Sequence, residues 1–141
     1  MRQTLRRSEI LRGKESLRSV FSSGKKSGGK FVKSYSLRVA PREDLPSVRT
    51  AFVVPGKVKR AVDRNRLKRL MRESFRRRKE LLFRHCEEFS VALDLVFLCL
   101  PPAKGARLPS FLQIDTDITS LLEKIIRTVP ANTPSGSELI A

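Results

Sequence analysis

The feature that most constrains this chain is the segment 57–79, in which twelve of 23 residues are basic and only two are acidic. Such a segment cannot be buried as a whole, because unpaired charges are very costly to remove from water. Apolar residues nevertheless recur at helical spacing within the segment and just beyond it, at Leu67, Leu70, Met71, Phe75 and Leu82. We therefore expect a helix that packs on a core by one face and presents cations on another.

The cations of this segment also follow helical spacing. They predict a stripe on a second face of the helix, made of Arg64, Lys68, Arg72, Arg76 and Lys79. Glu73 is placed to pair with Arg69 and Arg77 at i±4. Solvated helix faces usually mix signs, so this excess of cations favours a nucleic-acid surface. Arginine suits contacts to phosphates and to unpaired bases. Side chains that read base edges are scarce in this segment, Asn65 being the exception, so we expect recognition of the backbone and shape of folded RNA and not sequence reading of duplex DNA.

Charge and composition narrow the class of protein further. The first 79 residues carry +19 and the remainder −3, so a polyanion should meet one part of the molecule. With 141 residues and 40% hydrophobic content, the chain is long and apolar enough for one domain with a core. No apolar run is long enough to span a membrane, and no signal peptide follows the basic N-terminus. Cys86 and Cys99 form no CxxC pair, so we expect a reduced, cytoplasmic protein without a membrane partner.

The pattern of the whole chain predicts a single α+β domain without internal repeats. The expected elements are a helix over Ser8–Phe21 capped by Gly24, a turn or short edge strand over Lys25–Lys30, strands over Phe31–Ala40 and Thr50–Val54, the basic helix, a buried strand over Leu93–Leu100 and a helix over Asp117–Thr128. Residues 129–141 are rich in Pro, Ser and Thr and predict a loose tail, which sets the domain at 1–128.

Candidates for catalysis are few. Asp115 and Asp117 lie two residues apart, but no third carboxylate or histidine is placed to complete a metal site, and His85 is expected near a helix end without a chemical role. Phe21, with Phe31 or Tyr35, either lines a groove in which bases stack or packs in the core. We expect an RNA-binding protein without an active site of its own. The alternatives are a general RNA-binding protein, such as a ribosomal protein or RNA chaperone, and a metal-dependent protein nuclease.

One stretch of the sequence is specific enough to suggest a family. Residues Arg64–Arg76, RNRLKRLMRESFR, closely resemble the RNR helix of bacterial ribonuclease P protein components. The resemblance extends through Arg49–Lys57, which is similar to the strand and basic turn before that helix, and to Leu11–Gly24, which is similar to the family's first helix. Leu93–Cys99 and Ile118–Arg127 fit the later strand and the last helix by order and character.

The resemblance implies a function and a fold. Members of the family are small basic subunits of ribonuclease P, which removes the 5′ leader from precursor tRNA. The RNA subunit is the catalyst and binds most of the Mg²⁺, while the protein binds that RNA and the leader and holds no cofactor alone. The expected partners are therefore the RNA subunit and precursor tRNA, with no DNA or membrane. The implied fold is an α/β sandwich with a four-stranded sheet, whose left-handed βαβ crossover carries the RNR helix against the usual right-handed rule.

The resemblance also assigns roles to individual residues. The expected contacts to the RNA subunit are Lys57, Arg64, Asn65, Arg66, Lys68, Arg69, Arg72 and Arg76. The expected leader-binding cleft is formed by Leu17, Phe21 and Tyr35, with leucine at the first position where the family has an aromatic residue. Pro55-Gly56 replaces a pair that usually includes a lysine, which removes one cation from the turn before the helix.

Overall fold

The computed structural model of the protein describes residues 7–41, 46–103 and 105–131. Its elements are a short 3₁₀ helix η1 (Arg7–Glu9), α1 (Lys14–Ser23), β1 (Lys25–Gly28), β2 (Val32–Val39), β3 (Val48–Val53), α2 (Ala61–Glu88), β4 (Ala92–Cys99) and α3 (Phe111–Ala131). The expected α+β class is confirmed, and all the expected helices and strands are present within the described residues, with bounds that differ at several ends.

The four strands form one mixed sheet in the order β1-β2-β4-β3. β1 and β2 form an antiparallel hairpin, β2 is antiparallel to β4, and β3 is parallel to β4. The last strand in the sequence therefore lies in the centre of the sheet. α2 connects the parallel neighbours β3 and β4, so the basic helix is the crossover of a βαβ unit.

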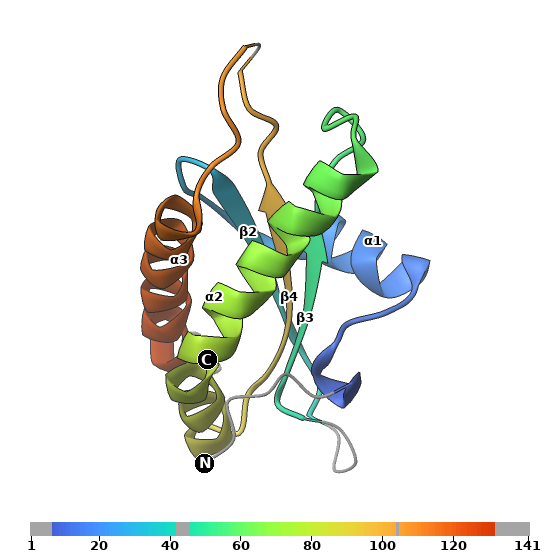
Figure 1. Ribbon diagram of the computed structural model, residues 1–141. Coiled ribbons are helices and arrows are strands. Elements are labelled where there is room, and N and C mark those ends of the chain that lie inside the picture. Colours follow the sequence, from blue (N-terminus) through green and yellow to red (C-terminus); the bar gives the residue numbers. More distant parts are fainter. Residues whose placement is uncertain (1–6, 42–45, 104, 132–141) are drawn as a thin grey trace.

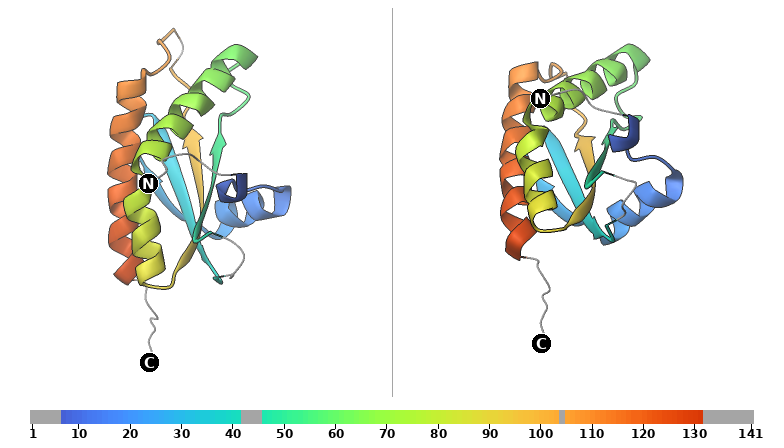
Figure 2. Two further views of the ribbon diagram at one scale, coloured as in Figure 1. Left: turned by 60° about the horizontal axis from the view of Figure 1, so that its bottom comes forward. Right: turned by 90° about the horizontal axis from the view of Figure 1, so that it is seen from below.

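Helices cover both faces of this sheet. α2 and α3 lie side by side on one face and α1 lies on the other, as the two rotated views show (Figure 1, Figure 2). Because successive strand residues point to opposite faces, β4 serves two cores. Its residues Leu93, Leu95 and Phe97 pack with α2 and α3, whereas Val96 packs with Val20 of α1.

Phenylalanines form the centre of the larger core. The ring of Phe75 on α2 lies 5.8 Å from Phe52 of β3 and 5.6 Å from Phe97 of β4, in edge-on or tilted geometries that aromatic pairs prefer. Leu67, Met71 and Phe75 are all fully buried. The apolar face predicted for the basic helix is therefore confirmed.

The N-terminal helix starts later than predicted. Residues of the expected span Ser8–Phe21 contribute first to η1 and then to a bridge between Ile10 and Thr50 beside β3. Gly13 follows with φ of +96°, a conformation that favours glycine and that separates this segment from α1. α1 then ends at Gly24, whose N–H donates to the Val20 carbonyl at 2.8 Å, so the predicted cap is confirmed.

The C-terminal helix is longer than predicted at both ends. It begins at Phe111 behind a capping box, in which the Ser110 N–H donates to the Gln113 side chain at 2.9 Å and the Gln113 N–H donates to the Ser110 hydroxyl at 3.3 Å. It continues through the buried Val129, so the predicted domain boundary at 128 falls inside α3. The rest of the predicted tail, 132–141, lies outside the described residues.

Asp117 of α3 fixes the turn between β1 and β2. Its carboxylate accepts hydrogen bonds from the backbone N–H groups of Phe31 and, at 3.0 Å, Val32. The carboxylate also approaches Gly29 so closely that a Cβ at that position would lie 2.9 Å from it and 2.8 Å from the Val32 carbonyl oxygen. The hairpin and α3 are therefore held together by a polar contact that requires glycine.

Candidate RNA-binding surface

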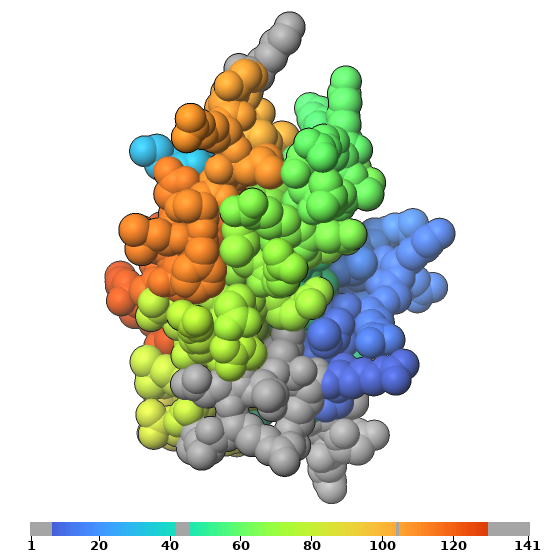
Figure 3. All heavy atoms as spheres, viewed as in Figure 1, coloured from blue at the N-terminus to red at the C-terminus, as the bar shows by residue number. Residues whose placement is uncertain are grey.

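The first half of α2 and the turn before it present most of the predicted RNA contacts. Lys57 lies in the turn, and Asn65, Arg66, Arg69 and Arg72 lie on the helix; all five side chains are exposed. None of the four cations forms an ion pair with another described residue. Figure 3 shows this segment in green as a continuous surface between the orange residues of α3 and the blue residues of η1 and α1.

Helical geometry divides these side chains between two flanks. Asn65, Arg69, Arg72 and Arg76 lie within 60° of one another around the axis at about 100° per residue, whereas Arg66 lies on the flank nearer to α3. The outermost side chains, Arg66 and Arg72, are thus about 120° apart around the helix axis. A single phosphate cannot contact all of them, but a folded RNA surface can.

Arg64 has a second role in this structure. Its guanidinium donates to the Val58 and Lys59 carbonyls, both at 2.7 Å, and the side chain is half-buried. The first arginine of the RNR motif therefore braces the turn that carries Lys57. Two further predicted contacts, Lys68 and Arg76, are also half-buried.

The second half of the helix departs from the predicted stripe. Lys79 is buried, with 7% of its surface exposed, and its ammonium lies 2.6 Å from the Glu9 carboxylate and 5.1 Å from the centre of the Phe83 ring. The prediction that Lys79 belongs to an exposed cationic stripe is therefore wrong. Its helical position places it between buried Phe75 and Leu82, so an inward-facing lysine needs a carboxylate, which the N-terminal segment supplies.

The acidic partners along α2 also differ from those predicted. Glu73 pairs with Arg76 and, at 3.5 Å, with Arg77, so the expected partner Arg77 is confirmed and Arg69 is replaced by Arg76. The hydrogen bond from Arg76 is the main cause that holds the pKa of Glu73 below its ordinary value, despite the opposing effect of desolvation. Arg69 is thereby left available on the exposed flank.

A network that the sequence did not predict joins α2 to α3. The Asp115 carboxylate accepts two hydrogen bonds from the Arg78 guanidinium, at 2.9 and 2.6 Å, and one from the buried Ser74 hydroxyl at 2.7 Å. The Arg78 hydrogen bond is the main cause that lowers the pKa of Asp115, against desolvation. Asp115 of α3 thus holds α2 against α3. Because Asp115 is distant from α2 in the sequence, local sequence patterns did not predict this contact.

The three predicted cleft residues come together on the α1 face of the sheet. Phe21 of α1, 38% exposed, meets the ring of Tyr35 of β2 edge-on, with centroids 4.8 Å apart. Leu17 and Tyr35 both pack against the smaller core, which contains Val20 and Val96. A partly exposed aromatic pair therefore lies beside the leucine, and Lys26, opposite Tyr35 in the register, supplies a neighbouring cation.

Metal and nucleophile chemistry finds little support in the described part of the chain. No group of three or more His, Cys, Asp or Glu side chains there is placed to hold a metal ion. His85 lies in the last turn of α2 with Nδ1 3.0 Å from the Leu81 carbonyl oxygen, as its predicted place near a helix end requires. Cys86 and Cys99 are free and buried, and desolvation raises the pKa of each thiol to about 11.

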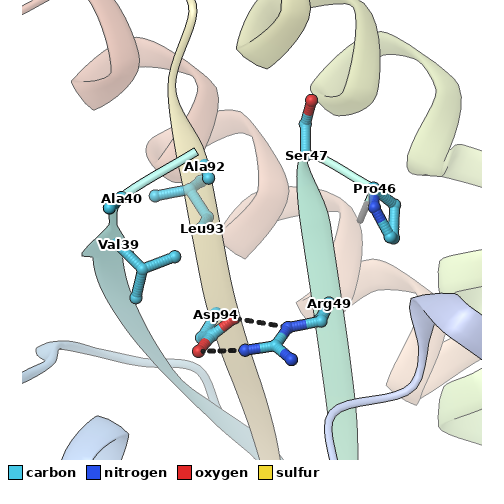
Figure 4. A pocket seen from close by; sticks show the side chains of 8 residues that line it. All are labelled: Val39, Ala40, Pro46, Ser47, Arg49, Ala92, Leu93 and Asp94. Carbon is cyan, nitrogen blue, oxygen red and sulfur yellow. Dashed lines mark hydrogen bonds and ion pairs between the residues drawn. The ribbon is translucent and has the colours of Figure 1, made fainter. Parts of the chain in front are cut away.

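A small cavity at one end of the sheet is structural. Arg49 of β3 and Asp94 of β4 form a two-pronged ion pair there, with both N–O distances at 3.1 Å (Figure 4). The cavity volume is ≈ 10 Å³, room for about one water molecule. This pair joins the parallel strands at the edge of the cavity and leaves no space for a ligand.

The fold and the exposed surface together define a class, a small basic α+β protein that carries an arginine-rich crossover helix and, on the other face of its sheet, a partly exposed aromatic pair. The Ribonuclease P family model matches residues 5–126 of the chain. The chain belongs to the ribonuclease P protein family, so it is a protein subunit of the ribonucleoprotein endoribonuclease that matures the 5′ ends of tRNA, and it associates with ribonuclease P RNA.

Individual relatives agree with this assignment. The chain is 35% identical over 130 residues to the ribonuclease P protein component of Chlorobium phaeobacteroides, covering 86% of this chain and 88% of the relative. It is 33% identical over 145 residues to that of Chlorobaculum tepidum, covering 96% and 91%. The fold is similar to the RNase P protein of Thermotoga maritima, with a TM-score of 0.62 at 23% identity over 82% of this chain and 96% of that one. The Staphylococcus aureus RNase P protein also gives 0.62, at 21% identity over 83% and 94%.

Proposed function

We propose that this protein binds the catalytic RNA of ribonuclease P through α2 and the turn before it, and the 5′ leader of precursor tRNA through the cleft between α1 and the sheet. The observation that carries the first part is a set of four exposed cations that have no acidic partner among the described residues, Lys57, Arg66, Arg69 and Arg72. Cations in this state are free to displace counterions from RNA phosphates.

The leader site is supported by the aromatic pair. A base of an unpaired strand gains roughly 1–3 kcal/mol by stacking on an aromatic side chain. Phe21 is exposed enough to offer such a contact, and Tyr35 supports its edge. Leu17 extends the apolar floor without a stacking face.

We assign the chemistry to the RNA subunit and its Mg²⁺, as the family resemblance implies. The protein's own contribution is then to bind and position both RNAs. The described residues support this division of labour, since Asp115 is engaged by Ser74 and Arg78, and Asp117 by the hairpin backbone. The purified protein, freed of all RNA, should not cleave precursor tRNA when Mg²⁺ is added.

The crossover that carries the basic helix is proposed to be left-handed. In Figure 1, β3 and β4 point in the same direction, α2 lies in front of them, and the chain passes from β3 on the right to β4 on the left. A right-handed connection, the usual case, would pass the other way. A rare handedness of this kind is consistent with the family to which the chain belongs.

The proposed site of action is the reducing cytoplasm, with neither membrane nor DNA as a partner. The two free thiols, Cys86 and Cys99, are consistent with this compartment. Within the described part of the chain, no helix combines the length and apolar character that a membrane crossing needs.

The test is a salt titration of affinity for a ribonuclease P RNA, together with leader removal at low Mg²⁺. Arg69→Ala and Arg72→Ala should each lower the slope of log affinity against log salt by roughly one unit or slightly less. Asn65→Ala is the uncharged control on the same flank and should lower affinity or activity with little change in slope. Unchanged slopes for both arginine variants would place the RNA surface elsewhere.

The leader contact needs a separate comparison. Phe21→Ala should weaken binding of precursor tRNA to the holoenzyme and leave mature tRNA, which lacks the leader, unaffected. Equal losses for both substrates would contradict the leader assignment. RNA binding without any stimulation of leader removal would instead favour a general RNA-binding role.

A further inference from the structure

A groove on the side of the sheet remote from the cleft is not used by the function above. It lies between the β1–β2 hairpin and the second half of α3 and has a volume of ≈ 250 Å³. The residues on which the argument depends are Lys25, Ser27, Ser34, Ser36, Lys124 and Thr128. A second hollow of ≈ 220 Å³ shares Lys25, Ser36 and Thr128 with it, so the two form one elongated groove.

The strand register gives this groove its polar floor. Lys25 lies opposite Ser36 and Ser27 lies opposite Ser34, so these four residues share one face of the hairpin. Tyr35, which belongs to the leader cleft, points to the other face. The serines of the groove floor and Tyr35 thus lie on opposite faces of the sheet, while Lys26 of the edge strand β1, opposite Tyr35 in the register, also lines the groove.

Ser34 is the most informative residue of the floor. It is 1% exposed, and its hydroxyl has no hydrogen-bond partner among the described residues. Buried polar groups are normally paired, and an unpaired one costs stability. A hydroxyl kept unpaired at the bottom of an open groove is suited to a ligand that brings an acceptor.

The charge of the groove indicates what that acceptor is. Lys25 and Lys124 are exposed and form no ion pair with another described residue. No carboxylate among the described residues lines either hollow. Glu123, the neighbour of Lys124, lines a different hollow between α2 and α3. Lysines above hydroxyls, without an acid nearby, favour an anionic oxygen ligand.

We propose that this groove is a second RNA-binding site, which takes an unpaired RNA strand with its phosphodiester groups on Lys25 and Lys124 and an acceptor oxygen on Ser34. The two adjoining hollows, of ≈ 250 and ≈ 220 Å³, each suit about one nucleotide, so together they fit a short strand and exclude a duplex. The site is at the β1 edge of the sheet, opposite the β3 edge. RNA that contacts α2 and this groove together must pass around α3.

The test is an NMR titration in which single-stranded oligouridylate is added to the full-length protein and the backbone amide signals of the protein are followed. Signals of β1, of Ser34 and Ser36, and of the Lys124 region should shift and saturate. Lys25→Ala combined with Lys124→Ala should weaken this local binding about tenfold and lower its salt slope by roughly 1.4, at about 0.7 per contact for single strands. Shifts in the leader cleft should persist in this variant.

Two controls distinguish a site from general attraction. Arg84→Ala with Arg107→Ala removes the same charge from exposed positions outside the groove and should change the local affinity less than twofold. Ser34→Ala should weaken binding severalfold without loss of stability, because the hydroxyl it removes has no partner in the protein. Equal losses in both charge variants, or no shifts at the groove, would overturn the proposal.

The source of the phosphate needs its own comparison. Uridine 5′-monophosphate and inorganic phosphate, titrated at the same phosphate concentration, should bind at least about tenfold more weakly than the oligonucleotide. Equal binding would make this a free-anion site and refute the RNA assignment. The outcome is independent of the function proposed above, because the Arg69 and Arg72 variants report on ribonuclease P RNA separately.

Discussion

Replacing Lys79 by methionine provides a direct test of how the basic helix is divided between RNA contacts and fold anchors. The substitution keeps the apolar stem but leaves the carboxylate of Glu9, whose side chain is 10% exposed, without the ammonium that lies 2.6 Å away. Breaking a buried pair by removing one partner costs about 3–5 kcal/mol, against about 0–1 kcal/mol for an exposed pair. Since a tenth of each side chain remains exposed, we expect the lower end, about 3 kcal/mol.

Urea unfolding, followed by circular dichroism, measures this loss. The double variant Glu9→Leu/Lys79→Met removes both charges and should recover stability to within about 1 kcal/mol of the parent, because an apolar pair avoids the desolvation that the ions suffer. Arg72→Ala is the matched control on the exposed flank and should change stability by no more than about 0.5 kcal/mol.

The same variants separate the two roles in RNA binding. Lys79→Met, measured where it is folded, should keep the salt slope of RNA affinity, whereas Arg72→Ala should lower it by roughly one unit or slightly less. If Lys79→Met retained full stability and lowered the slope as much as Arg72→Ala, Lys79 would be an RNA contact. The assignment of Lys79 as a fold anchor would then be refuted.

Three further changes test other parts of the fold by urea unfolding. Hydrogen bonds, first of all the one from Arg78, hold the pKa of Asp115 below its ordinary value. The ionised carboxylate therefore stabilises the fold above the unfolded pKa, and this stabilisation is lost as the pH falls through the folded pKa. Asp115→Asn should therefore reduce the loss of stability below about pH 4. Gly29→Ala should cost about 1–3 kcal/mol by overpacking, while Gly28→Ala, whose Cβ meets nothing within 4 Å, should be neutral or stabilising. Phe75→Ala should cost about 3–5 kcal/mol, and Leu112→Ala, 71% exposed, no more than about 0.5 kcal/mol.

The sequence predicted those parts of the fold that depend on local periodicity. The alternation in β2 places Tyr35 and Leu37 on one face, and this strand was predicted to within one residue at each end. The apolar positions of α2 follow a 3.6-residue period, which predicted the buried face of the helix but not its extension to Glu88. The start of α3 was predictable in principle as well. Ser110 and Gln113 have the spacing of a capping box, a signal that does not depend on apolar periodicity.

Contacts between distant residues were not predictable in this way. Lys79 and Glu9 are 70 residues apart, and nothing in the local pattern selects that carboxylate as the partner. The inward position of Lys79 was nevertheless visible in its spacing four residues after Phe75 and three before Leu82, both fully buried. A count of basic residues includes Lys79 among the RNA contacts, whereas its position around the helix axis places it with the core.

The central place of β4 in the sheet has a consequence for how the protein is made. During synthesis, β1, β2 and β3 emerge first, but β2 and β3 are not neighbours until β4, residues 92–99, is inserted between them. A nascent chain that ends before Ala92 therefore has only the short β1–β2 hairpin, and its cation-rich crossover has no sheet to pack on. Because the pairings of β4 with both neighbours join residues distant in sequence, they should limit the folding rate. The central sheet, and the packing of the crossover on it, can therefore be completed only after the eight residues of β4 have been made.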